Sequence, residues 1–332
     1  MNNLRTDHSD RSDSLDAIRG LAISLVIARH YFGFKQGMLG VDLFFVLSGF
    51  LIGGILLDSR NQPGYFTSFY GRRAFRILPL YWLALVIATP KHWQYYLFFA
   101  QAIPWLQFGF PTDEPLLVTW TLAAEEQFYL VLPVLIWCLP QRWLVRVLWT
   151  GVLLAPVWRW WAHAYLPTLC WEWLLPGRLD ELFGGALLAC FVRGYCRSVA
   201  AWIALACIPP LCDLGYAVAF TPFCFLSVAA ATCAAIVWAS TKVARPVLLR
   251  PLIWPGRRCY ALYLFHWPFY VDTGLGQIPS GLASIAVVCA FAELSWRLIE
   301  APLIAYAKRR FPRAGAEDVS SAFPVANPVG RP

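Results

Sequence analysis

Long apolar runs separated by short polar or basic connections make up most of the 332-residue chain. About 17 to 25 predominantly apolar residues form one helical crossing of a bilayer. The pattern therefore predicts an all-α polytopic membrane protein, a bundle of about ten transmembrane helices. The expected spans lie near residues 17–33, 40–57, 75–89, 122–139, 144–162, 179–193, 198–214, 219–240, 260–275 and 280–305.

One further apolar segment, 93–108, is short and contains Pro104. We expect a re-entrant or interfacial piece there rather than an eleventh crossing. The chain then divides into a disordered cytoplasmic N-terminus at 1–14, a membrane bundle at 15–306, and a cytoplasmic tail at 307–332. The tail is rich in Pro, Ala and Ser, so we expect it to be disordered as well.

Composition agrees with a membrane protein. Hydrophobic residues make up 59% of the chain and charged residues only 14%, whereas about a quarter of the residues in a soluble domain are charged. The ten cysteines lie mostly within or beside apolar segments and form no CxxC pair. We expect them to be small apolar packing residues rather than a disulfide framework.

Basic residues indicate the orientation of the bundle, because Lys and Arg accumulate in cytoplasmic loops. With ten spans, the basic clusters at 242–258 and 308–313 and both termini lie in the cytoplasm. An eleventh crossing at 93–108 would place both clusters outside. The net charge of +8 comes from residues scattered at span ends, not gathered with exposed aromatic residues, so we expect no nucleic-acid partner.

Arg19 and His30 are the candidate functional residues of the first span. They are eleven residues apart, so a helix places them on one face, about 16 Å apart along its axis. A cation could hold the anionic end of a ligand while the imidazole acts as a base at the other end. Two alternatives stay open: Arg19 extends to the headgroups with Asp16 as its helix partner, or His30 is a core histidine bonded to a carbonyl.

Polar groups also begin the next two spans. Asp42 returns to the depth of His30, where an acid could fix the tautomer of the imidazole or serve only the helix dipole. Arg72, Arg73 and Arg76 start the third span on the cytoplasmic side. Their guanidinium groups can bind a phosphorylated ligand, or they can simply follow the positive-inside rule.

The fourth span begins with a polar stripe. Thr121, Glu125 and Tyr129 are spaced four residues apart, so they share one helix face at the outer membrane surface. In the alternative interpretation Thr121 is only an N-cap with a Glu in the first turn. Arg178 and Asp180 lie at the outer start of the sixth span and are weaker candidates for the same site.

Two other polar features lie within later spans. His266 is expected to be buried in the ninth span. Glu293, Arg297 and Glu300 are spaced four and three residues apart, so one guanidinium group can pair with both carboxylates. We interpret this group as a structural ion-pair ladder.

Several of these stretches occur together in the order LDAIRGLA, GVDLFFVLSGFLI, FYGRRAFRILPLYW, WTLAAEEQFYL, RLDELFGGALLA, YALYLFHWPF and RLIEAPL. In that order they resemble the bacterial acyltransferase type 3 family of integral membrane acyltransferases, from Leu15 to about Leu303. The family pattern of Arg and His separated by ten residues falls on Arg19 and His30. The family's Ser-Glu-Tyr pattern falls on Thr121, Glu125 and Tyr129, with Thr in place of Ser.

The resemblance implies a bacterial inner-membrane O-acyltransferase that moves an acyl group, commonly acetyl, from cytosolic acyl-CoA to an envelope or lipid-linked carbohydrate. It implies no bound cofactor and no metal; acyl-CoA is a co-substrate. Some members carry an extra periplasmic hydrolase-like domain, which we do not expect here. The rival class is a transporter or flippase for a lipid-linked glycan, because buried charges also mark transport paths.

The resemblance also implies roles for the candidate residues. His30 would be the general base, with Asp42 and Glu125 as the other catalytic residues. The remaining residues would bind the two substrates. Those expected to hold the acyl-CoA phosphates are Arg19, Arg72, Arg73 and Arg76, and those expected to position the acceptor sugar are Thr121, Tyr129, Arg178 and Asp180.

Overall fold

The computed structural model describes residues 2–108, 115–165, 174–195 and 250–312, and every regular element in these ranges is a helix. The long helices are α1 (Asn2–Phe32), α2 (Leu39–Ser59), α3 (Tyr65–Ala88), α6 (Trp120–Cys138), α7 (Gln141–Tyr165), α8 (Leu179–Val192) and α14 (Gln277–Ser295). The shorter α-helices are α4 (Trp93–Tyr96), α5 (Ala102–Phe108), α12 (Arg250–Arg257), α13 (Cys259–Phe265) and α15 (Ala301–Arg310). Single turns join them at η1 (Lys35–Met38), η2 (Leu117–Thr119), η4 (Leu175–Arg178) and the π-helical η6 (Trp296–Glu300).

The all-helical fold class is confirmed for the described residues, and helices cover most of the expected spans there. Within the described ranges, three helical stretches are long and apolar enough to cross a membrane, namely Lys35–Ser59, Leu117–Cys138 and Gln277–Arg310. The expected spans at 198–214 and 219–240 lie outside the described residues, as does most of the tail. The count of ten spans and the orientation of the termini therefore stay predictions.

The ninth span was expected at 260–275, and these bounds are wrong. Helix α13 ends at Phe265, and the described chain has no regular element between it and α14. Pro268 supplies no amide hydrogen and restricts the residue before it, and Gly274 and Gly276 follow with positive φ. These residues favour an irregular connection over a continued helix.

The N-terminus also differs from expectation. Helix α1 begins at Asn2, so residues 2–14 of the segment expected to be disordered are helical in the structure. Starting a helix is costly, but extending one is not, because each added residue forms one hydrogen bond and has only its own backbone fixed. The apolar part of α1 therefore allows the helix to extend into the polar segment before it. The 93–108 segment forms α4 and α5, of four and seven residues. Each helix is too short to cross a bilayer, which agrees with the re-entrant or interfacial piece expected at this segment.

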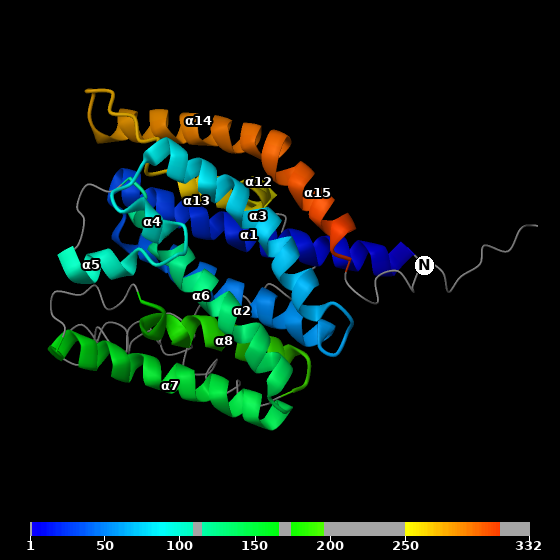
Figure 1. Ribbon diagram of the computed structural model, residues 1–332. Helices are drawn as coiled ribbons and strands as arrows, with labels where there is room; N and C mark the ends of the chain where they lie inside the picture. Colours follow the sequence, from blue (N-terminus) through cyan, green and yellow to red (C-terminus); the bar gives the residue numbers. More distant parts are fainter. Residues whose placement is uncertain (1, 109–114, 166–173, 196–249, 313–332) are drawn as a thin grey trace, which may run out of the picture.

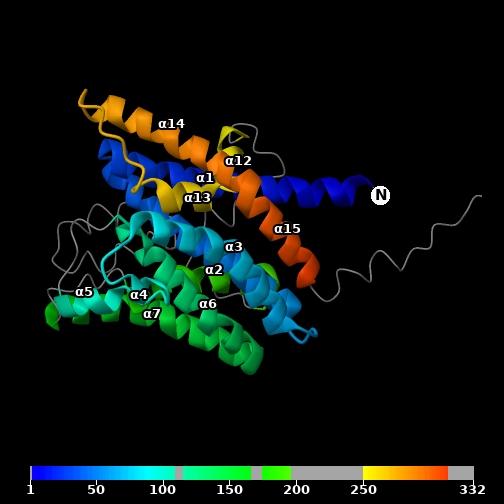
Figure 2. The same cartoon turned by 45° about the horizontal axis from the view of Figure 1, so that its top comes forward.

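The helices pack as one layered bundle. Helix α2 packs against α8, which packs against α7, and α1 packs against α12 and α2. In Figures 1 and 2, α7 lies at one edge of the bundle and α14 at the other, with α2 and α6 between them. Helix α14 continues through a bend into α15, which approaches the N-terminal half of α3. This arrangement brings α1, α2, α3, α6 and α13 around the site described below.

Close approach of α2 and α8 depends on glycine. A Cβ atom on Gly185 would lie 2.1 Å from the carbonyl oxygen of Val46, and one on Gly49 would lie 2.0 Å from that of Leu182. Backbones in membranes approach in this way where small residues line the contact.

We expect Gly185→Ala to lower the free energy of unfolding by about 1–3 kcal/mol, because the added methyl group overlaps a backbone atom and forces the helices apart. Thermal unfolding of the detergent-solubilised protein measures this. Val192→Leu, at an exposed position of the same helix, is the control and should leave the melting temperature unchanged. Equal melting temperatures for wild type and Gly185→Ala would contradict the tight α2–α8 contact.

Candidate active site

A cavity of about 210 Å³ lies between α1, α2, α3, α6 and α13. Its wall combines aliphatic and aromatic side chains with an unusual number of polar ones for the interior of a membrane protein. The polar lining residues are Arg19, Ser48, Arg73, Arg76, Thr121, Glu125, Tyr129, Tyr260 and Tyr263. Most of the residues expected from the sequence to act on substrates therefore meet here, although they come from three different helices, α1, α3 and α6.

The cavity is long. Residues from Val41 to Ile55 on α2 line it, and the fourteen helical steps between these two residues extend about 21 Å. The lining residues of α2 recur every three or four positions, so they form one face of the helix. An extended ligand with chemically different ends fits such a shape better than a compact one.

The first end of the cavity is cationic. Arg73 lies with its guanidinium carbon 3.5 Å from the centre of the Tyr129 ring, a cation–π contact. Arg76 lines the cavity beside it, and Arg19 enters from α1. The expected helix pairing of Arg19 with Asp16 is confirmed by a hydrogen bond, so Arg19 is held at the cavity wall.

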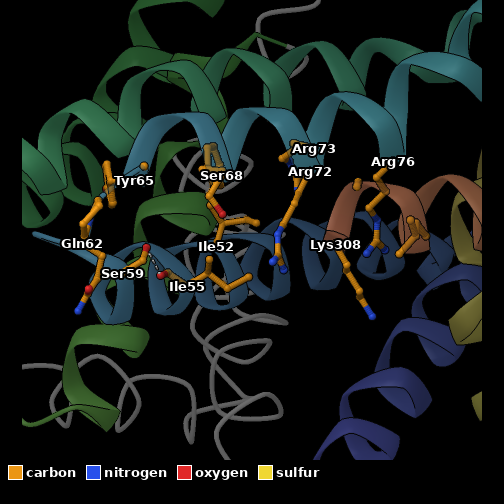
Figure 3. A pocket seen from close by; sticks show the side chains of 15 residues that line it. Ile52, Ile55, Ser59, Gln62, Tyr65, Ser68, Arg72, Arg73, Arg76 and Lys308 are labelled. Atoms are coloured by element: carbon orange, nitrogen blue, oxygen red, sulfur yellow. Dashed lines mark hydrogen bonds between the residues drawn. The ribbon is translucent and has the colours of Figure 1, made fainter. Parts of the chain in front are cut away.

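A second cavity, of about 160 Å³, adjoins the first, because Ile52, Ile55, Arg73 and Arg76 line both. Figure 3 shows Arg72 and Arg76 extending from α3 and Lys308 from α15. The expected arginine cluster is therefore divided. Arg72 lines only the second cavity, and its Nε donates to the carbonyl oxygen of Phe311 at 2.6 Å.

The polar stripe on α6 runs along the first cavity, and the structure confirms that its three members share a face. Tyr129 hydrogen-bonds Ser48 of α2 under Arg73, so it lies at the cationic end. The carboxyl group of Glu125 lies between the hydroxyl groups of Ser48 and Tyr129 and the charges of Arg73 and Arg76.

Thr121 lies two helical turns from Tyr129, at the other end of the stripe. Its hydroxyl group is 2.6 Å from that of Tyr263 on α13, and the Tyr263 hydroxyl also donates to the carbonyl oxygen of Val118 at 2.6 Å. The N-cap interpretation of Thr121 is not what the structure shows, because Thr121 is the second residue of α6 and its hydroxyl group faces the cavity.

His30 lies just beyond this second end. It is not among the described residues that line the cavity, but its Nδ1 is 2.8 Å from Nε2 of His266. Nδ1 of His266 is in turn 2.6 Å from the carbonyl oxygen of Tyr263, a lining residue. His30 is partly exposed, and the expected burial of His266 is confirmed because none of its surface is accessible.

Asp42 was expected beside His30, and in the structure it lies with Arg178 instead. Its Oδ1 accepts a hydrogen bond from Arg178 at 3.1 Å, and no hydrogen bond or ion pair joins Asp42 to His30 in the described part of the chain. The physical reason is that Asp42 points toward the end of η4, where the buried guanidinium group of Arg178 needs carboxylates around it. Arg178 also donates to Glu181 at 2.7 Å.

Asp180 belongs to the same buried region. It forms a two-bond ion pair with Arg159 of α7, at 3.0 and 2.8 Å. Neither Arg178 nor Asp180 is among the described residues that line the two cavities. The structure thus joins α2, α7 and α8 through these charges rather than presenting them to a ligand.

The remaining sequence expectations concern the last helix and the cysteines. Arg297 pairs with Glu293 at 2.6 Å, but Glu300 accepts a hydrogen bond from Ser295, so only part of the expected ladder forms. Cys190 and Cys259 are buried, and Cys289 is partly buried, so three of the described cysteines pack inside the bundle. No group of metal-ligating side chains occurs among the residues that the structure describes.

Five residues of the site were not among the expected ones: Ser48, Tyr260, Tyr263, Lys308, and His266 as a partner of His30. Tyr263 and His266 share the segment YALYLFHWPF at a spacing of three, which places them on one helix face and was a usable signal. The sequence held no signal for Ser48 or Lys308, because a single Ser in an apolar helix and a Lys at a helix end are common.

Comparison with known proteins adds an independent observation. A family model described as an acyltransferase domain matches residues 12–292. The chain is 28% identical to the peptidoglycan O-acetyltransferase OatA of Listeria monocytogenes, over 87% of this chain and 55% of that protein. It is 28% identical to the putative peptidoglycan O-acetyltransferase YrhL of Bacillus subtilis, over 93% of this chain and 57% of that protein.

A further relative, the O-acetyltransferase OatA of Staphylococcus aureus, is 27% identical over 87% of this chain and 56% of its own length. The chain therefore spans about half the length of these curated relatives. No solved structure matches this chain.

Proposed function

Because this chain belongs to the acyltransferase-domain family, we propose that it is a membrane O-acyltransferase of the bacterial inner membrane. It would move an acyl group, acetyl in the first instance, from cytosolic acyl-CoA to a hydroxyl group of a cell-envelope carbohydrate. Relatives named peptidoglycan O-acetyltransferases suggest a peptidoglycan sugar as the acceptor.

The observation that carries this proposal is the long cavity with a cationic end and a hydroxyl-rich end. Arg73, Arg76 and Arg19 supply guanidinium groups that suit the phosphates of a nucleotide. Arg72 and Lys308 in the adjoining cavity extend the same positive region. The length of about 21 Å along α2 suits the pantetheine arm, which would carry the thioester toward Thr121 and Tyr263.

The reaction would take place near that second end. The acceptor oxygen attacks the thioester carbonyl carbon, its proton passes to His30, a C–O ester bond forms, and the C–S bond breaks. The coenzyme A thiolate then takes a proton and leaves as the thiol. Thr121 would orient the reacting groups there, and Glu125 and Tyr129 would line the path toward the cationic end along the α6 face. Topology follows the charge pattern, with ten spans, both termini cytoplasmic and the cationic end of the cavity facing the cytosol.

The experiment that tests the function compares envelope carbohydrate from cells with and without this protein by mass spectrometry. The proposal predicts a mass increase of one acyl group per modified sugar, lost on mild alkaline treatment because the link is an ester. A carbohydrate that is unmodified in both strains would contradict it. Loss of the carbohydrate itself in the deletion strain would indicate transport.

The donor site makes a separate prediction. We expect Arg73→Gln and Arg76→Gln each to raise the KM for acetyl-CoA about tenfold or more, because a hydrogen bond to a charged group is worth about 1.5–3 kcal/mol. Arg72→Gln should have a smaller effect, since its Nε already donates to Phe311. The assay is transfer of radiolabel from [14C]acetyl-CoA to carbohydrate in membrane vesicles.

Arg309→Gln is the matched control for this series. It removes the same charge from an exposed position near the end of α15 and should leave the KM at the wild-type value. If all four variants titrate alike with acetyl-CoA, the arginines serve only membrane topology.

A further inference from the structure

We infer that His266 is a positioning residue that holds His30 in the one tautomer able to accept a proton from the acceptor hydroxyl. This inference rests on the proposed function and deepens it. It replaces the role expected of Asp42, which the structure gives to Arg178.

The carbonyl oxygen of Tyr263 determines the state of His266. Nδ1 of His266 is 2.6 Å from that oxygen, and a carbonyl oxygen can only accept, so Nδ1 must carry the hydrogen. Neutral imidazole has a single N–H, which leaves Nε2 of His266 as an acceptor. This assignment comes from the hydrogen-bond network, as tautomers generally do.

The state of His30 then follows. Its Nδ1 lies 2.8 Å from the acceptor Nε2 of His266, so Nδ1 must be the donor. The second nitrogen of His30, Nε2, therefore keeps its lone pair. A general base needs this free lone pair, and the partly exposed position of His30 leaves the nitrogen open to a ligand.

The orientation of the two rings supports a directed hydrogen bond. Their planes differ by 20° and their centroids are 4.9 Å apart, much farther than the two bonded nitrogens, so the rings meet edge to edge. Trp267 packs against His30 at 74° with a centroid distance of 5.2 Å. His30 is thus held by one hydrogen bond and one aromatic contact, which restrict its rotation.

His266 cannot itself reach a substrate, because it is fully buried. Its place is fixed by a backbone hydrogen bond as well, since the Tyr31 hydroxyl donates to its carbonyl oxygen. When His30 accepts a proton and becomes positively charged, its Nδ1–H bond to His266 becomes charge-assisted and about twice as strong. His266 would in this way stabilise the charged intermediate state without touching the reacting atoms.

A matched pair of variants tests the inference. The Gln side chain in His266→Gln can reach the position of Nε2 and accept from His30, whereas the shorter Asn in His266→Asn reaches only the position of Nδ1. We expect His266→Asn to lower kcat for [14C]acetyl transfer on the order of 100-fold, as loss of effective general-base catalysis does. His266→Gln should stay within about tenfold of wild type, and the KM for acetyl-CoA should be unchanged in both.

Two measurements separate this role from a structural one. Melting temperatures of the two variants in detergent should agree with each other. Tyr70→Phe, which removes a tyrosine hydrogen bond to the carbonyl oxygen of Leu130 away from both imidazoles, should keep the wild-type kcat. Equal kcat values for His266→Asn and His266→Gln would overturn the inference, whether both match wild type or both are inactive. Absence of acetyl transfer in the wild type would instead refute the proposed function.

Discussion

Acyl transfer should fall by about 10²- to 10⁴-fold in His30→Ala, the range that a general base contributes. In the proposed mechanism His30 accepts the proton of the acceptor hydroxyl at its free ring nitrogen, and alanine leaves no group there to accept it. The measurement is release of ester-linked acyl groups from envelope carbohydrate of cells that express each variant at equal membrane levels.

A histidine outside the site is the control for this loss. His92→Asn replaces an exposed histidine with positive φ by a residue that tolerates this backbone conformation, and it should acylate at the wild-type level. Acylation by His30→Ala at the level of His92→Asn would remove His30 from the mechanism. Binding of acetyl-CoA should survive in His30→Ala, because the cationic residues lie at the other end of the cavity.

Asp180→Ala should cost about 3–5 kcal/mol of stability, because it leaves the buried guanidinium group of Arg159 without its carboxylate. Both side chains are completely inaccessible to solvent. Removing both charges together, in Arg159→Leu with Asp180→Leu, should recover most of the loss, since apolar groups of similar size often replace a buried ion pair without cost. Thermal unfolding in detergent measures each variant.

The chain contains a matched control for this ion pair. Asp58 binds Arg193 through two hydrogen bonds of 2.6 Å, but 63% of the Asp58 side chain is exposed. Asp58→Ala should therefore change stability by only about 0–1 kcal/mol. If Asp180→Ala melts like wild type and loses only activity, Asp180 binds the acceptor, as the resemblance implied, and the structural role is contradicted.

The candidate site shows which kind of inference succeeds from sequence. Spacing along one helix predicted correctly that Thr121, Glu125 and Tyr129 share a face, and that Asp16 can pair with Arg19. These relations depend on the helical repeat alone. The expected pairing of Asp42 with His30 is absent from the described chain, where Asp42 pairs with Arg178. The expectation rested on equal depth in the membrane, which does not determine the direction in which a side chain points.

The sequence by itself therefore determined the helical class, most helix positions in the described chain, the family and the residues on the α6 stripe. Hydrophobic periodicity and ordered local motifs carry that information within a few turns. Only the tertiary structure decided that Arg73 and Arg76 line the long cavity while Arg72 lines the next one.

It also decided that His266, 236 residues away, is the partner of His30. Such partners depend on how closely whole helices pack, as at Gly49 and Gly185. They also depend on which oppositely charged groups lie beside each buried charge. These are interactions between distant segments, which no local pattern in the chain encodes.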